Sequence, residues 1–243
     1  MSEWAAKRFW KEASAESESG GFAIRLDGRP VRTPAKTPLI VPTKPMANAI
    51  AAEWDAQSER IDPMSMPVTR SANAAIDKTG PQKDEVAALI TAYGETDLLC
   101  YRADSPASLV TAQREAWDPL LDWAAITLGT RLTLVSGVMF QAQSDEAIET
   151  LAHHVKALNV FELTAFHDLV SLSGSLIIGF AAIHNHIKPD ALWKISRIDE
   201  DWQISQWGVD EEASLLAETK RQAFLHAHRF YVLSQNANLL HNH

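Results

Sequence analysis

Residues 22–34 read FAIRLDGRPVRTP, and this stretch decides the fold expected for the first part of the chain. Apolar side chains alternate from Phe22 to Leu26, as they do in a strand with one buried face. The pair Asp27-Gly28 follows and is typical of the tight turn in a β-hairpin. Val31 and Thr33 continue the alternation after the turn. The stretch therefore predicts two antiparallel strands.

The residues that follow predict another strand and a helix. Prolines enclose a short apolar run at 38–42, which fits a brief strand and gives an antiparallel meander of three or four strands. Thr43 is suited to cap a helix expected over 47–57, where Ile50 and Trp54 lie four residues apart and share one face. We expect this helix to pack on the sheet, with Trp54 as its anchor.

A change of character near residue 67 marks a domain boundary. Pro63 and Pro67, with Met64 and Met66 between them, predict an extended linker over 61–68 because prolines disfavour helix. We expect a β-rich N-terminal domain at 1–67 and a larger all-α C-terminal domain at 68–243, an α+β protein. Helical spacing recurs at 71–78, 82–93, 107–128, 145–158, 164–183, 189–206 and 210–233.

Two short segments of the second domain are not predicted to be helical. The run 132–135 fits either a strand or a buried turn. The polar tail from about residue 234 is expected to fray.

Composition excludes several classes of function. The 243 residues include 22 basic and 31 acidic side chains, and the resulting charge of -9 repels nucleic acid. The single cysteine, Cys100, allows no internal disulfide and fits a reducing compartment. The most apolar run, 169–183, is interrupted by Ser and Gly and is too short to insert stably in a membrane. With no secretory signal in residues 1–10, we expect a cytoplasmic protein.

Motifs for catalysis or for cofactor and metal binding are missing. The glycines at 174 and 179 precede no lysine, so the chain has no phosphate-binding loop, and no G-x-G-x-x-G fingerprint occurs. His184 and His186 are two residues apart, which on a helix places them about 200° from each other and prevents them from sharing a metal ion. We expect no catalytic residue, no cofactor and no metal.

An acidic stretch is the strongest candidate for a surface that binds another protein. Residues 199–201 and 210–212 are all Asp or Glu, with no basic residue between them. A partner could dock on these carboxylates. Those at 210–212 also open a predicted helix, where the helix dipole favours each by about 0.3–1 kcal/mol. Both interpretations stand.

Tryptophan and methionine supply a second candidate surface. The chain has eight tryptophans, and most are expected in the core. Met64 and Met66 lie in the proline-bounded segment that cannot easily bury itself, and methionine adapts well to binding surfaces. We expect this segment to contact a partner.

The order of short motifs along the chain indicates a family. They cover about residues 8–215 in a specific order and spacing, and comprise LDGRPVRTP at 26–34, VPT at 41–43, AEWDAQ at 52–57, IDP at 61–63, MPVT at 66–69, AID at 75–77, TDLLCYR at 96–102, WDPL at 117–120 and WG at 207–208. In this order the chain resembles the assembly chaperones of F1-ATP synthase that act on the alpha subunit, known from mitochondria and alphaproteobacteria.

The resemblance implies a function and a set of residues. It implies a non-catalytic protein that binds the unassembled alpha subunit and shields the surface that would otherwise meet a beta subunit. An acidic residue soon after the Trp-Gly pair matters in the family; Glu211 matches it best, although Ala213 and Ser214 replace the His-Asp of mitochondrial members. The expected partner-binding residues are Trp207, Glu211, Glu212, Met64 and Met66, and the structural motif residues are Asp27, Gly28, Trp54, Asp97 and Trp117. We expect the protein to be a monomer on its own.

Two rival hypotheses remain open at this point. One is a small-molecule-binding protein or enzyme that uses an interdomain cleft, with Asp97, Tyr101 and Arg102 as its polar groups. The other is a scaffold module for some other protein.

Overall fold

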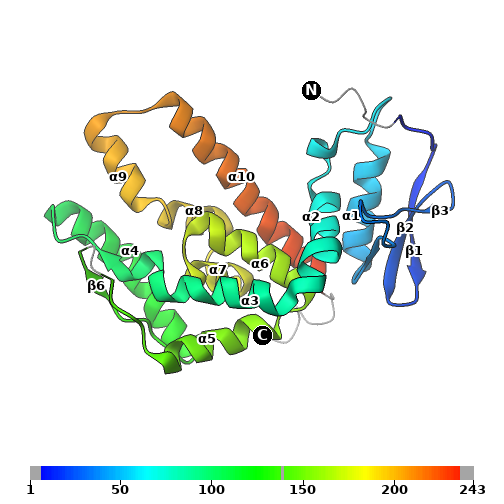
Figure 1. Cartoon of the computed structure of the whole chain (residues 1–243). Coiled ribbons are helices and arrows are strands. Elements are labelled where there is room, and N and C mark those ends of the chain that lie inside the picture. Colours follow the sequence, from blue (N-terminus) through cyan, green and yellow to red (C-terminus); the bar gives the residue numbers. More distant parts are fainter. Residues whose placement is uncertain (1–6, 138–139, 236–243) are drawn as a thin grey trace. The chain divides into compact units, whose positions relative to one another are not determined.

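The computed structural model describes residues 7–137 and 140–235, and these form two compact units (Figure 1). Unit 1 draws on Met1–Lys83, Val160–Thr164 and Arg229–His243, so far as these are described, and unit 2 on Asp84–Asn159 and Ala165–His228. Helices α6 (Val160–Ser173) and α10 (Glu211–Ser234) contribute to both. The compact units are thus discontinuous in sequence, and the domain boundary after residue 67 stays a prediction.

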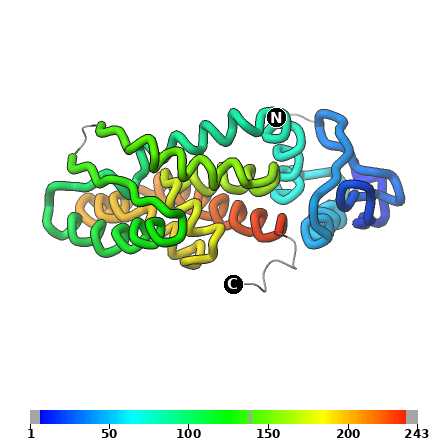
Figure 2. Tube along the Cα trace, turned by 90° about the horizontal axis from the view of Figure 1, so that it is seen from below, coloured from blue at the N-terminus to red at the C-terminus, as the bar shows by residue number. Residues whose placement is uncertain are grey.

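A small antiparallel sheet in unit 1 is built around β2. Strand β2 (Gly21–Leu26) pairs along its whole length with β1 (Ala13–Glu18). Its other edge pairs with β3 (Arg29–Pro30) at one end and β4 (Ile40–Val41) at the other. The four antiparallel strands agree with the prediction, but β4 returns to β2, so the order is not a simple meander; Figure 2 follows these strands in dark blue.

The hairpin turn forms where Asp27-Gly28 predicts it. Both residues are left-handed, with φ of 47° at Asp27 and 78° at Gly28, as tight hairpin turns require. The Asp27 carboxylate also accepts hydrogen bonds from the backbone N–H groups of Glu12 and Lys11, each at 3.0 Å, and these bonds lower the pKa of Asp27. The turn residue therefore fixes the segment that leads into β1 as well.

Helix α1 (Lys44–Asp55) packs on the sheet as predicted. The Thr43 hydroxyl caps its first turn by accepting a hydrogen bond from the Met46 N–H at 3.2 Å. Ile50 is fully buried on the inner face. The Trp54 ring meets the buried Trp10 edge-to-face at 5.2 Å between centroids, so it joins the helix to the chain segment that enters the sheet.

The extended linker predicted over 61–68 is wrong. Residues Pro63–Ser65 form a 3-10 turn, and α2 (Pro67–Ala74) begins at the second proline before it passes into a π-helical turn, Ala75–Thr79. Proline suits the first turn of a helix because the N–H that it lacks would have no partner there. The Glu53 carboxylate accepts the next two N–H groups, from Val68 at 2.7 Å and Thr69 at 2.8 Å.

Unit 2 is helical, with one small parallel pair of strands that the all-α prediction did not include. Its remaining helices are α3 (Lys83–Thr91), α4 (Ala107–Thr127), α5 (Asp145–Ala157), α7 (Leu176–Ile183), α8 (Pro189–Ile195) and α9 (Ile198–Trp207). Strand β5 (Tyr101–Arg102) pairs with β6 (Val135–Ser136), so the ambiguous run 132–135 ends in a strand. None of the described helices is both long enough and apolar enough to cross a bilayer.

Helix α7 is the centre of this unit, and its start corrects one prediction. All its residues are buried. The single helix expected over 164–183 is two helices, because Gly174 is left-handed with φ of 72° and the Ser175 hydroxyl caps α7 by accepting from the Ile178 N–H at 3.0 Å. The helix expected over 189–206 is likewise divided into α8 and α9.

Asp97 supports the buried helix α7 from inside the core. Its side chain is fully buried and accepts hydrogen bonds from the N–H groups of Leu99 at 2.9 Å and Ile177 at 3.1 Å. Burial raises the pKa of Asp97 to about 6 despite these bonds, which favour the charged form. The residue is therefore a capping group for α7 and is not presented to solvent.

Gly179 allows α7 to approach α6 closely, and it supplies a first test of the core. A Cβ at this position would lie 2.6 Å from Val170 Cγ2 and 3.0 Å from Phe166 Cε2. We predict that Gly179→Ala lowers the free energy of unfolding by about 1–3 kcal/mol, because both neighbours are buried and must shift. Urea unfolding measures this change, and an unaltered or higher midpoint would contradict the packing.

Asp97 gives the stability of the protein a specific dependence on pH. Its folded-state pKa of about 6 lies above the ordinary value of 3.8, so its contribution to stability is fully present below about pH 4 and is lost as the pH rises through about 6. Asp97→Asn cannot ionise. We predict that the unfolding free energy of the wild type relative to this variant falls by about 3 kcal/mol between about pH 4 and pH 7. If urea titrations show a difference in unfolding free energy between the two proteins that does not change with pH, the Asp97 carboxyl does not titrate in this way.

Candidate functional site

Large apolar side chains are exposed together where α9 ends and α10 begins. The exposed fractions are 77% for Trp207, 70% for Val209, 71% for Leu215 and 56% for Leu216. No other stretch of ten described residues exposes four large apolar side chains. Exposed apolar side chains that gather in one short stretch of the chain are a candidate site of interaction with another molecule. We term these four residues, with Glu211 and Glu212, the hairpin surface.

Local sequence explains the bend that creates this surface. Helix α9 ends at Gly208, which is left-handed with φ of 91° and has open space where a Cβ would be. Asp210 then caps α10, since its carboxylate accepts from the N–H groups of Glu212 at 2.9 Å and Ala213 at 3.1 Å. Figure 1 shows α9 and α10 as two arms joined by this short connection.

Because Asp210 supplies the cap of α10, the carboxylates of its acidic neighbours are not needed for this role. Glu211 and Glu212 are exposed, and within the described residues neither carboxylate makes a hydrogen bond or ion pair. Two other acidic residues of the predicted cluster serve the fold: Asp199 accepts from Gln113 Nε2 at 2.6 Å, and Glu200 pairs with Arg197 at 2.9 Å. Asp201 is exposed, and like Glu211 and Glu212 its carboxylate makes no hydrogen bond or ion pair among the described residues.

A groove of about 280 Å³ lies between α8, α9 and the first half of α10. Charged side chains that are already paired form much of its wall; Arg221, for example, contacts Asp190 at 2.7 Å and Glu218 at 2.8 Å. Its lining residues are Trp193, Lys194, Arg197, Asp201, Ile204, Ala213, Ser214, Ala217, Glu218 and Arg221. The groove is therefore flanked by paired charges but lined mainly by apolar surface, and its wall residues Ala213 and Ser214 lie between Glu212 and Leu215 of the hairpin surface.

The sequence-predicted partner-binding residues fall in two places. Trp207, Glu211 and Glu212 lie together on the hairpin surface. Met64 is 73% exposed in unit 1, where its sulfur lies 3.5 Å from Arg70 Nη1. Met66 is only 2% exposed, because the start of α2 turns its side chain into the core. The surface role predicted for the pair is therefore available to Met64 alone.

Sequence analysis did not single out Val209, Leu215 or Leu216. The sequence did contain a signal for the two leucines. Adjacent residues of a helix do not face the same way, so an apolar pair just after a helix cap cannot place both side chains on one buried face. Only the exposure of both leucines shows that this part of α10 has no neighbour within the described chain that covers it.

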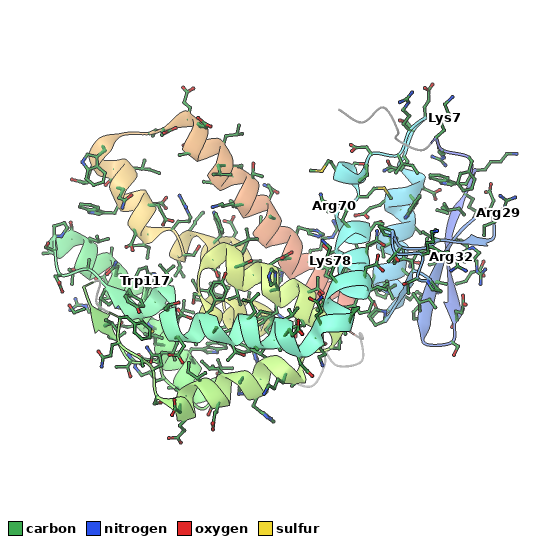
Figure 3. All side chains as sticks on the ribbon, viewed as in Figure 1. Lys7, Arg29, Arg32, Arg70, Lys78 and Trp117 are labelled. Atoms are coloured by element: carbon green, nitrogen blue, oxygen red, sulfur yellow. The ribbon has the colours of Figure 1, made fainter. Side chains whose placement is uncertain are left out.

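Two of the three polar residues assigned to a cleft in the rival hypothesis, Asp97 and Arg102, are engaged inside unit 2, whereas Tyr101 is half-buried. Asp97 is buried, as described above. The Arg102 guanidinium contacts the Asp118 carboxylate at 2.7 Å, donates to the Leu99 carbonyl at 2.7 Å and lies over the Trp117 ring at 5.3 Å. Trp117, labelled in Figure 3, is fully buried, and its Nε1–H donates to the Ile195 carbonyl at 2.9 Å. These groups hold α4 to its neighbours.

Comparison with known proteins identifies relatives over nearly the whole chain. The family model described as ATP12 chaperone protein matches residues 7–125. The mitochondrial protein atp12 of Schizosaccharomyces pombe is 28% identical over 219 residues, which cover 85% of this chain and 75% of that protein.

Solved structures agree more closely. The crystal structure of Atp12 from Paracoccus denitrificans is 49% identical, with a TM-score of 0.93 over 95% of this chain and 99% of that one. An aspartate-to-lysine mutant of the P. denitrificans protein gives 49% identity and a TM-score of 0.94 over 96% of this chain and 100% of that one. The chain therefore belongs to the ATP12 family, the ATP synthase assembly chaperones that the ordered sequence motifs predict.

Proposed function

We propose that this chaperone binds the unassembled alpha subunit of F1 through its hairpin surface and covers the face that would otherwise meet a beta subunit. The observation that carries the proposal is the group of exposed apolar side chains beside two uncommitted carboxylates. An exposed apolar face on a lone subunit invites aggregation, and covering it removes that hazard. Release then requires only that the true neighbour compete for the same face.

The hairpin surface suits a reversible contact of this kind. An interface of ordinary size buries about 800 Å² on each partner, so the hairpin surface forms the centre of the contact and needs further area around it. Trp207 is the expected energetic anchor, because exposed tryptophans dominate many protein interfaces. Glu211 and Glu212 add specificity for a client face that carries basic side chains.

Binding without catalysis is part of the proposal. Two of the three polar residues considered for a cleft support it, because Asp97 is buried and Arg102 is paired with Asp118. Within residues 7–137 and 140–235, no group of three His, Cys, Asp or Glu is arranged to hold a metal. We further propose that the protein acts in the bacterial cytoplasm as a monomer, where its single buried thiol stays reduced.

Charge reversal on the hairpin surface tests the partner contact. We predict that Glu211→Lys weakens binding to isolated F1 alpha subunit at least about tenfold, while the free energy of unfolding changes by less than about 1 kcal/mol, because Asp210 supplies the cap. Glu85→Lys is the matched control, since Glu85 is also an exposed acidic residue in the first turn of a helix, α3. Equal binding by both variants in gel filtration and titration would remove Glu211 from the interface.

Truncation of the apolar anchor tests the hairpin surface independently of charge. We predict that Trp207→Ala costs about 2 kcal/mol of binding free energy, roughly thirtyfold in Kd, and leaves the melting temperature nearly unchanged because the ring is exposed. Ile126→Ala is the control, as Ile126 is also an exposed apolar residue of unit 2 but lies on α4. Loss of binding in both variants, or in neither, would contradict a contact centred on the hairpin.

A complex of the wild type with isolated alpha subunit tests the proposal as a whole. We expect a stable complex without added nucleotide, measured by gel filtration with light scattering. The rival enzyme hypothesis would be favoured by turnover of a substrate or by a large thermal shift with a small metabolite. Stable binding to some other protein, with none to the alpha subunit, would favour the scaffold hypothesis.

A further inference from the structure

The net charge of the chain is divided very unevenly between its two units. The stretches of unit 1 contain 13 Lys and Arg against 11 Asp and Glu, a formal charge of +2. Those of unit 2 contain 9 against 20, a formal charge of -11. The net charge of -9 for the whole chain therefore includes a small excess of basic residues in unit 1. The proposed contact at the hairpin surface does not involve these residues.

Several carboxylates of unit 1 are committed to its own backbone. Glu53 accepts from the first turn of α2, Asp27 from the segment before β1, and Asp55 from the Ala13 N–H at 2.8 Å. Arg32, Lys36 and Lys78 are exposed, and among the described residues none of these three forms an ion pair. We term them the loop cation cluster.

Asp77 brings the cluster together. It accepts from the Thr33 hydroxyl at 2.7 Å and from the Ala35 N–H at 3.0 Å, which ties the loop between β3 and β4 to the π-helical turn after α2. Arg32 and Lys36 each lie next in sequence to one of these tethered residues, and Lys78 follows Asp77 itself. The Asp77 tether thus brings the chain positions of these three cationic residues to one part of unit 1. Figure 3 labels Arg32 on the loop and Lys78 on the helical turn.

The loop is held in one conformation before any partner arrives. The Thr33 N–H donates to the Thr37 carbonyl and the Lys36 N–H to the Thr33 carbonyl, both at 2.8 Å. The Arg32 guanidinium donates to the Lys36 carbonyl at 2.8 Å, so its own position is restricted. A preformed site loses less conformational entropy on binding than a flexible one.

Lys36 occupies a backbone position that lysine does not favour. Its φ is 68°, in the left-handed region that glycine and asparagine adopt at lower cost. An unfavourable backbone conformation, held by its surroundings, indicates a role for the side chain that the fold itself does not require. Here the strained position carries a lysine whose backbone carbonyl accepts from the Arg32 guanidinium.

We propose that the loop cation cluster binds a short acidic segment of a protein partner. Arginine pairs well with carboxylates through its fork of N–H donors, and two lysines beside it favour a segment with several Asp or Glu residues. A membrane or a nucleic acid is a less suitable partner, because its extended negative charge is repelled by the -11 of the other unit in the same chain. The loop cation cluster belongs to unit 1 and the hairpin surface to unit 2, so this proposal does not depend on the alpha subunit being the client.

Binding of a short fluorescein-labelled polyglutamate peptide to the full chain, followed by fluorescence anisotropy, tests this site. The triple variant Arg32→Glu, Lys36→Glu and Lys78→Glu is expected to weaken binding at least about tenfold, and wild-type binding should fall as salt rises. The matched control is Lys11→Glu, Lys44→Glu and Arg60→Glu, three exposed cations elsewhere in unit 1 with the same total charge change. The control should stay within about twofold of the wild type.

Two further variants separate the site from the stability of the loop. Lys36→Gly removes one cation and relieves the left-handed backbone, so the melting temperature is expected to hold or rise while peptide affinity falls. The double variant Lys36→Glu and Lys78→Glu keeps the Arg32 hydrogen bond, in case the triple variant does not fold.

Several results would overturn the proposal. These are equal losses in the cluster and control variants, unchanged peptide affinity in a folded cluster variant, and no peptide binding by the wild type at low salt. Tighter binding of phosphatidylserine vesicles or single-stranded RNA than of the peptide, abolished by the cluster substitutions, would assign the site to a different class of partner.

Discussion

The burial of α7 is the constraint on which unit 2 depends. A helix with no exposed residue has no water to satisfy the N–H groups of its first turn, so protein groups must supply every acceptor. Ser175 supplies one from the adjacent position, and Asp97 supplies another from a distant part of the chain. Gly174 makes this arrangement possible because its left-handed backbone turns the chain between α6 and α7. A carboxylate in the core is thus retained despite the cost of desolvating its charge.

The same unit leaves large apolar side chains exposed where α9 ends and α10 begins. Helices α4 and α8 pack on α7 and are held by bonds such as the one from Trp117 to Ile195. Beyond them, α9 and the start of α10 have too few neighbours to bury Trp207 or the two leucines. A well-packed interior beside an exposed apolar surface suits a protein that acts by binding, because the packed helices hold the hairpin surface in place.

Much of the fold follows from local sequence. The hairpin at Asp27-Gly28, the cap at Thr43 and the helix that carries Trp54 each depend on residues a few positions apart, so pattern and turn chemistry predict them. The ordered motifs predict the family for the same reason. The single helix expected over 164–183 is wrong because the left-handed Gly174 and the Ser175 cap divide it, and the start of α7 depends in addition on Asp97, far away in the sequence.

The candidate site was harder to predict than the fold. The acidic stretch includes the segment that the structure exposes. Only tertiary contacts distinguish Asp199, which accepts a hydrogen bond from Gln113, from Glu211, whose carboxylate has no partner among the described residues. Met66 is buried because α2 starts at Pro67, and that start relies on Glu53 from α1. Residue type and spacing do not show which distant residues contact one another, whereas the hydrogen bonds and side-chain exposure of the folded chain do.

The discontinuity of unit 1 has a consequence for biosynthesis. The Thr43 hydroxyl, which caps α1, donates to the Leu233 carbonyl at 2.5 Å, and Thr79 and Glu162 receive hydrogen bonds from Thr164 and Gln235, each at 2.8 Å. Thr43 and Thr79 therefore gain these partners only after residues much later in the sequence have been translated. At about 5–20 residues per second, translation from Lys83 to Arg229 takes on the order of ten seconds. Throughout that interval the start of α1 and the π-helical turn after α2 lack these partners, so unit 1 of this assembly chaperone is itself incomplete during synthesis.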